Sequence, residues 1–179
     1  ANQSPNARLN KKINLENDQE HCNSLKAGQD EFVQQVKADK RVSPTEQTIL
    51  IRARTQLNAC KNDMGFIRVE PNWSIQTRQY ASYLNGTIAF YNANFSTASH
   101  IYSALTQVEQ AWIKETAQYM LIRCQLNLAH QSGVAEYGDL DRSKINPKTV
   151  VALFDSITAY FKAYPNGRYA ASARGFLRR

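Results

Sequence analysis

The stretch that decides the fold is YLNGTIAFYNANFSTASHIYSAL, residues 83–105. Apolar residues recur at helical spacing on both sides of the short link Ala93-Asn94-Phe95. Two successive helices joined by a link of three residues pack side by side and antiparallel. The stretch therefore predicts a helical hairpin, and hairpins repeated along a chain build a solenoid.

Composition supports a helical protein. The chain has 179 residues, 42% of them hydrophobic and 21% charged, which suits one globular domain or a short repeat array. Only 7 Gly and 5 Pro occur, fewer than an all-β chain needs for its turns. No run approaches 18 consecutive apolar residues, so the sequence predicts no membrane span.

The net charge of +7 raises the question of a nucleic-acid partner. No run reaches the five or six like charges of a nucleic-acid-binding tail, so a solvated basic surface is favoured. The densest basic positions are Lys11-Lys12, Lys37, Lys40, Arg41 and Arg178-Arg179.

Local signals divide the chain into three parts. Residues 1–17 are polar and predict a flexible lead-in, and residues 18–64 predict a helical pair. The second helix of that pair begins at Ser43-Pro44-Thr45-Glu46, which has the residues of a capping box with Pro at the first helical position. Pro71 predicts an extended connector over residues 65–73.

Residues 74–179 predict five helices interrupted by an insertion at residues 131–146. The insertion is polar and contains two Gly. The expected helices run from Ser74 to about Asn92, about Ser96 to Glu109, about Ala111 to His130, Pro147 to Tyr164, and onward from near Arg168.

The hairpin at residues 83–105 resembles a tetratricopeptide repeat (TPR). In that family, a small residue of the first helix lets the second helix approach, and a small residue and an aromatic of the second helix fill the gap between hairpins. Gly86, Ala98 and Tyr102 have that spacing, and Phe95 stands at the turn. The sequence departs from the family at Ser82, where a Trp is usual, and at Gln110, where a Pro is usual.

A second stretch, ITAYFKAYPNGRYAASARGFL (residues 157–177), is similar to a pattern in bacterial envelope TPR proteins such as outer-membrane assembly lipoproteins. In this register Gly175 is the small packing residue of a further repeat. The resemblance covers about residues 74–179. It implies an all-α fold of antiparallel helical hairpins, stacked as a short TPR-like right-handed solenoid.

The resemblance also implies a binding groove for a partner protein or peptide. In TPR proteins one face of the first helix of each hairpin tends to line a concave groove. Core packing is the competing interpretation of these positions, because Tyr and Phe also serve it. The residues on this face are Tyr80, Tyr83, Thr87, Phe90 and Tyr91.

The sequence carries no sign of catalysis, and we expect no enzyme, cofactor, metal or small-molecule substrate. His21, His100 and His130 have no partner at a ligand spacing, and no phosphate-binding or nucleophile motif occurs. The N-x-S/T sequons at Asn2, Asn72, Asn85 and Asn94 are those expected by chance in an Asn-rich chain.

The expected function is a protein-protein interaction scaffold of the bacterial cell envelope, in the periplasm or at the outer membrane. The alternatives are a helical accessory domain of a larger envelope enzyme and, less favoured, a nucleic-acid-binding helical repeat. The polar opening of the chain resembles either a mature protein after signal removal or a trimmed one.

The last helix, residues 168–179, has no second helix after it in this register. Repeat arrays normally end in a polar capping helix, whereas Ala171, Phe176 and Leu177 are apolar. We therefore expect this helix to pack on residues 148–164 and leave an apolar strip uncovered. Further residues, a partner or a second copy of the chain would cover that strip.

We predict a disulfide between Cys22 and Cys60, because each lies near the open end of the antiparallel pair at residues 18–64. In the chain-entropy model, closing this loop stabilises the fold by roughly 3–4 kcal/mol, and it requires an oxidising compartment such as the periplasm. Mass analysis of the denatured, unreduced chain should find a single free thiol, that of Cys124. Three free thiols would contradict the prediction.

Overall fold

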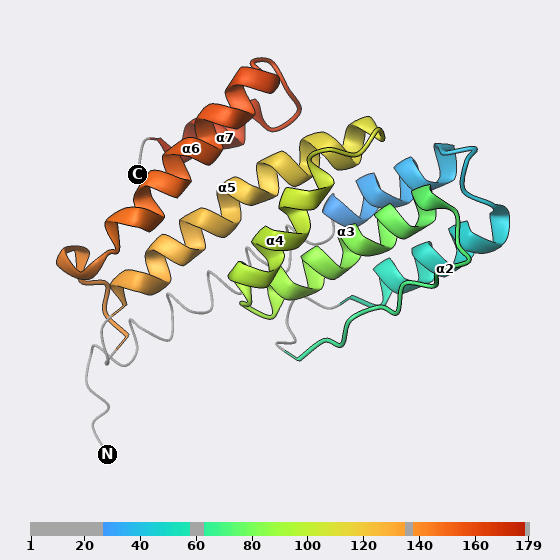
Figure 1. Cartoon of the computed structure of the whole chain (residues 1–179), viewed down its shortest axis with the longest axis horizontal. Helices are drawn as coiled ribbons and strands as arrows, with labels where there is room; N and C mark the ends of the chain where they lie inside the picture. Colours follow the sequence, from blue (N-terminus) through green and yellow to red (C-terminus); the bar gives the residue numbers. More distant parts are fainter. Residues whose placement is uncertain (1–26, 58–62, 135–137, 178–179) are drawn as a thin grey trace. The chain divides into compact units, whose positions relative to one another are not determined.

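The structure, a computed structural model, describes residues 27–57, 63–134 and 138–177. These residues fall into two compact units, residues 1–65 and residues 66–179. All regular elements in the described ranges are helices, apart from one isolated β-bridge between Val134 and Leu140 (Figure 1). The predicted all-α class is therefore confirmed for this part of the chain.

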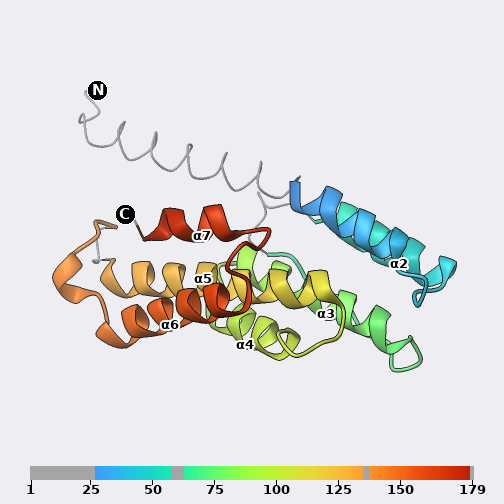
Figure 2. The same cartoon turned by 90° about the horizontal axis from the view of Figure 1, so that it is seen from above.

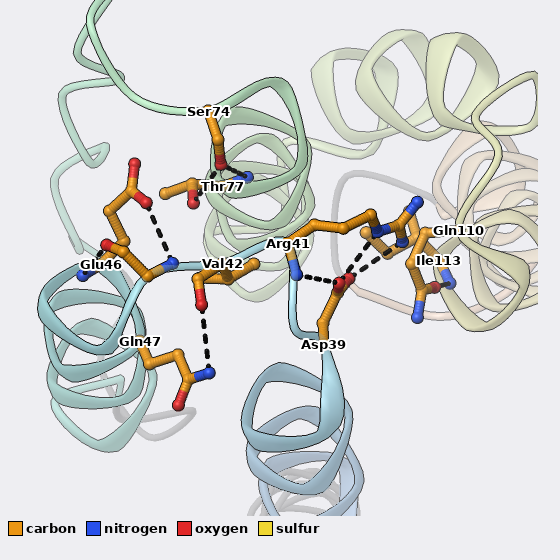
Figure 3. A network of polar contacts seen from close by, with 10 residues as sticks. Asp39, Arg41, Val42, Glu46, Gln47, Ser74, Thr77, Gln110 and Ile113 are labelled. Carbon is orange, nitrogen blue, oxygen red and sulfur yellow. Dashed lines mark hydrogen bonds and ion pairs between the residues drawn. The ribbon is translucent and has the colours of Figure 1, made fainter.

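The described part of the first unit holds two helices, residues 27–38 and α2 (Pro44–Thr55). The predicted capping box at the start of α2 is confirmed. The Ser43 hydroxyl accepts a hydrogen bond from the Glu46 amide at 3.2 Å, and the Glu46 carboxylate accepts one from the Ser43 amide at 3.2 Å (Figure 3). α2 ends at Thr55.

A charged contact shapes the link between these two helices. The Asp39 carboxylate accepts hydrogen bonds from the backbone N–H of Arg41 at 3.1 Å and from its guanidinium at 2.9 and 3.0 Å (Figure 3). The Gln47 side chain donates to the Val42 carbonyl at 3.2 Å. Local polar contacts therefore satisfy backbone groups that would otherwise be left over at the helix ends.

The second unit consists of five α-helices and one short 3₁₀ helix within its described residues. Helices α3, α4, α5 and α6 pack against one another in chain order, and α3 also packs against α5. Figure 2 shows α7 running alongside α5 and α6. The elements are α3 (Ile75–Tyr91), α4 (Phe95–Leu105), α5 (Ala111–Gly133), η1 (Arg142–Lys144), α6 (Pro147–Ala163) and α7 (Ala170–Phe176).

Helix starts in this unit follow the sequence signals, whereas the ends of α4 and α5 do not. The Ser74 hydroxyl caps α3 by accepting from the Thr77 amide, as expected, and the Gln110 side chain caps α5 by accepting from the Ile113 amide at 2.7 Å (Figure 3). α4 ends at Leu105 instead of Glu109, because Thr106 turns back and bonds the Ser103 carbonyl through both its hydroxyl and its amide.

The insertion at residues 131–146 is more ordered at its base than the sequence indicates. α5 continues to Gly133, whose carbonyl accepts from the Asp141 amide at 2.7 Å. A Cβ at Gly133 would lie 2.6 Å from the Ile145 side chain, so only glycine allows the returning chain to approach. The described part of the insertion therefore folds back on the end of α5.

The predicted close approach at Gly86 is confirmed. A Cβ placed on Gly86 would lie 2.9 Å from the Tyr102 ring, closer than real contacts allow, and at a tight 3.2 Å from the Ile101 side chain. Ala98 and Tyr102 of α4 are fully buried, as expected for residues that fill this hairpin. The missing side chain at Gly86 thus sets the spacing between α3 and α4.

The packing role predicted for Gly175 is wrong. Gly175 is exposed, and a Cβ there would meet nothing within 4 Å. The packing face of α7 is formed instead by Ala170 and Ala173, which are buried in a cluster with Ile157 and Tyr160 of α6. Gly175 follows Ala173 by two residues, or about 200° around the helix, and points away from that face.

The expectation for the last helix is met where the structure describes it. α7 packs on α6 through the cluster just described, whereas Phe176 is only partly buried and Leu177 is 53% exposed. On α6, Val151 and Phe154 are 59% and 53% exposed one turn apart. Apolar surface therefore remains uncovered on both elements.

Replacing Gly86 with Leu should lower the free energy of unfolding by about 1–3 kcal/mol, because the new side chain collides with the Tyr102 ring. The matched control is Gly175→Leu, which fills open space and should leave the stability within about 0.5 kcal/mol. Urea denaturation followed by circular dichroism measures both. Equal losses at the two positions would contradict the packing described here.

Candidate functional site

Four of the five residues predicted to line a groove are buried. Tyr80, Tyr83, Thr87 and Phe90 are between 0 and 7% exposed, so the prediction that they present a surface to a partner requires correction. Contacts of Tyr83, Thr87 and Phe90 with α4 and α5 explain their burial. The Tyr83 ring contacts the rings of Tyr102 at 5.9 Å and Trp112 at 5.1 Å between centroids.

Tyr102 is the centre of this packing. Its hydroxyl shares a 3.1 Å hydrogen bond with the Thr87 hydroxyl, which also donates to the Tyr83 carbonyl at 3.2 Å. Burial raises the pKa of Tyr102 well above its ordinary value, with the neighbouring Tyr83 adding to the effect. A neutral, hydrogen-bonded phenol at this point joins α3 to α4.

The fifth predicted groove residue, Tyr91, is half-buried and keeps part of its side chain accessible. Its ring meets the edge of the Phe90 ring at 5.5 Å. From α5, the guanidinium of Arg123 lies over the same Phe90 ring at 4.8 Å, and Arg123 is also half-buried. We call this part of α3 and α5 the Tyr91–Arg123 surface.

A second feature of α3 is an extended segment held along it. Residues 66–70, called the strap below, form neither helix nor strand. Exposure alternates over residues 66–69, with Phe66 and Arg68 exposed and Ile67 and Val69 half-buried, and Glu70 is half-buried as well. A period of two is that of an extended chain with one face against a surface.

The side chain of Asn85 ties the strap to α3. The Ile67 amide donates to the Asn85 carbonyl oxygen at 2.7 Å, and the Asn85 amide nitrogen donates to the Ile67 carbonyl at 2.9 Å. Both backbone groups of one residue are thereby satisfied, which is the pairing that a residue of a neighbouring β-strand would give. Asn85 therefore binds the backbone of the strap and leaves its side chains free to differ.

A polar network joins α5, α6 and the start of α7. The Glu115 carboxylate accepts from the Tyr160 hydroxyl at 2.9 Å and from the Arg168 amide at 2.8 Å. The Tyr160 oxygen in turn accepts from the Tyr169 amide at 2.9 Å, and the Tyr169 hydroxyl shares a 2.8 Å hydrogen bond with Thr116. The network fixes the turn that leads into α7.

Glycine is required in that turn, because a Cβ at Gly167 would lie 2.7 Å from the Tyr160 hydroxyl and 2.8 Å from the Glu115 carboxylate. Burial raises the pKa of Tyr160 to about 12, the Tyr169 amide opposes this, and the adjacent Glu115 adds to it. The neutral phenol is the form that can donate to the carboxylate.

The described residues contain no group of three or more His, Cys, Asp or Glu side chains placed to hold a metal ion. Among the described helices, none combines the length and the apolar character that a bilayer crossing requires. Cys124 is buried and free, as predicted, and burial raises the pKa of its thiol to about 12. Cys22 and Cys60 lie outside the described residues.

Comparisons with protein-family models, curated proteins and solved structures find no match for this chain. The resemblance to TPR proteins therefore stays a prediction.

Sequence reasoning missed two polar residues that form hydrogen bonds between distant parts of the sequence, Asn85 and Glu115. Asn85 was noticed only as part of a sequon, and its partner Ile67 lies 18 positions away. Glu115 bonds a backbone amide 53 positions away. The sequence signal for Asn85 is that a polar residue stands next to the packing glycine, Gly86. The signal for the turn held by Glu115 is Gly167, which follows the Tyr-Pro pair.

We predict that Tyr160→Phe makes stability less sensitive to alkaline pH. The folded pKa of Tyr160 lies above its ordinary value of 10.0, so its contribution is fully present below pH 10 and is lost as pH rises toward about 12. Urea denaturation of both proteins from pH 8 to 11.5 gives the two slopes. The slope of the free energy of unfolding against pH reports the titration alone, because the hydrogen bonds that the variant loses are lost at every pH. Identical slopes for the two proteins would contradict the prediction.

Proposed function

We propose that this chain is a protein-protein interaction scaffold of the bacterial cell envelope, built as a TPR-like right-handed stack of helical hairpins. The observation that carries the proposal is the packing order of the second unit. Helices α3 to α6 pack in sequence, and α3 also packs on α5, so the first helices of successive hairpins lie against each other. That is the order expected of stacked hairpins in a solenoid.

Details of the packing support the same proposal. A glycine of α3 admits the aromatic ring of α4, as the resemblance implies, and α7 packs on α6 and α5 as the first helix of another hairpin would. The rings of Tyr119 in α5 and Tyr169 stack at 4.4 Å between centroids. Small residues and aromatics thus fill the interface between α3 and α4 and the interface of α7 with α5 and α6.

The Tyr91–Arg123 surface is the part of the predicted groove that stays accessible. Tyr and Arg are the residue types that most often carry binding energy at protein interfaces. Both side chains flank the buried Phe90 ring, which restricts their motion and lowers the entropy lost when a partner binds. We place the partner protein on this surface.

The proposed location in the periplasm or at the outer membrane depends on the predicted Cys22–Cys60 disulfide, because such bonds persist in oxidising compartments. Self-association is a secondary part of the proposal. The exposed Leu177, together with the exposed Val151 and Phe154 of α6, supports it, since uncovered apolar side chains favour contact with a second copy.

Site-specific photo-crosslinking tests the proposal. A photoreactive amino acid in place of Tyr91, in the full chain, should join it to a discrete protein in native envelope extract. The matched control carries the same group at Ala104, an exposed position on α4. Equal labelling from the two positions, or none from Tyr91, would contradict the proposal. RNase- or DNase-sensitive products from Tyr91 would instead favour the nucleic-acid alternative.

A further inference from the structure

We propose that the face of α3 around Asn85 is a receptor for an extended polypeptide segment, and that the chain's own strap occupies it until a partner's segment replaces it. The proposal rests on the proposed function as a protein-binding scaffold and names the kind of partner: a protein with an extended, alternately apolar segment.

The first step is the chemistry of Asn85. One amide side chain supplies one acceptor and one donor group, and both are used on the N–H and C=O of Ile67. These are groups that every residue except proline presents in the same way. The contact therefore recognises an extended backbone of almost any sequence, so a partner's segment can make the same two bonds.

The second step is the side-chain pattern of the strap. Ile67 and Val69 are half-buried, whereas Phe66 is 57% exposed and the Arg68 side chain is 87% exposed. The Arg68 guanidinium forms an ion pair with the Glu70 carboxylate of the strap itself, with 3.2 Å between Nε and Oε1. Ion pairs at the surface contribute little to stability. A competing segment then needs two apolar residues spaced by two, and no proline at the residue that Asn85 binds.

The third step is the strength of the contacts described for the strap. Hydrogen bonds between neutral groups make a small net contribution to stability, and the Ile67 and Val69 side chains are only half-buried. What favours the strap over a free segment is its covalent attachment, which gives it a high effective concentration at Asn85. A partner that binds elsewhere on the scaffold gains the same advantage for its own segment.

The test uses the full chain and a fluorescent peptide with the sequence of residues 64–71, followed by anisotropy. An opened variant, Ile67→Pro with Val69→Asp, lacks the N–H that donates to Asn85 and should bind the peptide at least about tenfold more tightly than the unaltered chain. Adding Asn85→Ala to the opened variant should reverse the gain. A control peptide with N-methyl isoleucine at the Ile67 position lacks the donor to Asn85 and should not bind.

A second measurement guards against loss of folding in the opened variant. In the otherwise unaltered chain, Asn85→Ala should speed hydrogen exchange of the Ile67 amide while the amides of α3 stay protected. An unchanged rate at Ile67 would overturn the proposal. So would an opened variant that keeps its circular dichroism spectrum but binds no peptide, or binds it equally well with Ala at position 85.

The two proposals can fail separately. A partner crosslinked at Tyr91 whose binding ignores Asn85 and the strap would leave the scaffold function standing and remove the receptor on α3. Peptide binding that depends on Asn85, without any protein crosslinked at Tyr91, would leave the receptor and move the partner away from the Tyr91–Arg123 surface.

Discussion

The close approach of α4 to the backbone of Gly86 is the constraint on which the second unit depends. Without a side chain at that position, the Tyr102 ring reaches the space beside α3, and its hydroxyl finds Thr87. Tyr83 then lies between Tyr102 and Trp112, which carries the contact from the first hairpin into α5. A larger residue at Gly86 would displace this whole chain of aromatic contacts, because protein interiors have little free volume to absorb a shift.

The Glu115 network positions α5, α6 and α7 relative to one another, as the Gly86 contact does for α3 and α4, but it does so through hydrogen bonds to a charged group. A carboxylate on α5 accepts from a phenol on α6 and from a backbone amide just before α7. Hydrogen bonds to a charged acceptor are stronger than neutral ones, and here one acceptor orients three successive elements. The short α7, with seven residues, could not hold a helical conformation by propensity alone, so this fixed turn and the buried Ala170 and Ala173 explain why it forms.

Short-range features of the fold could be predicted from the sequence, and long-range pairings could not. The caps at Ser43 and Ser74 depend on residues within three positions, and the glycine-aromatic spacing at Gly86 belongs to one hairpin. The face of Tyr80, Tyr83, Thr87 and Phe90 was misjudged because the same residue types serve a groove and a core, and only the position of other helices distinguishes the two. The prediction for Gly175 is wrong for a related reason. Contacts with α6 determine which face of α7 is buried, and no local sequence pattern shows them.

A receptor that reads the backbone has a consequence for selectivity. Asn85 cannot discriminate between segments by their side chains, and the two apolar positions beside it exclude few sequences. Selectivity must then come from a second contact, since linking two weak contacts multiplies their affinities without requiring either to be strong. The Tyr91–Arg123 surface lies on the same helix α3 and on its neighbour α5, so one partner can engage both. In this arrangement the strap raises the affinity that a segment needs in order to bind at Asn85. Segments without the second contact compete poorly with the tethered strap, and only a partner bound at both places displaces it.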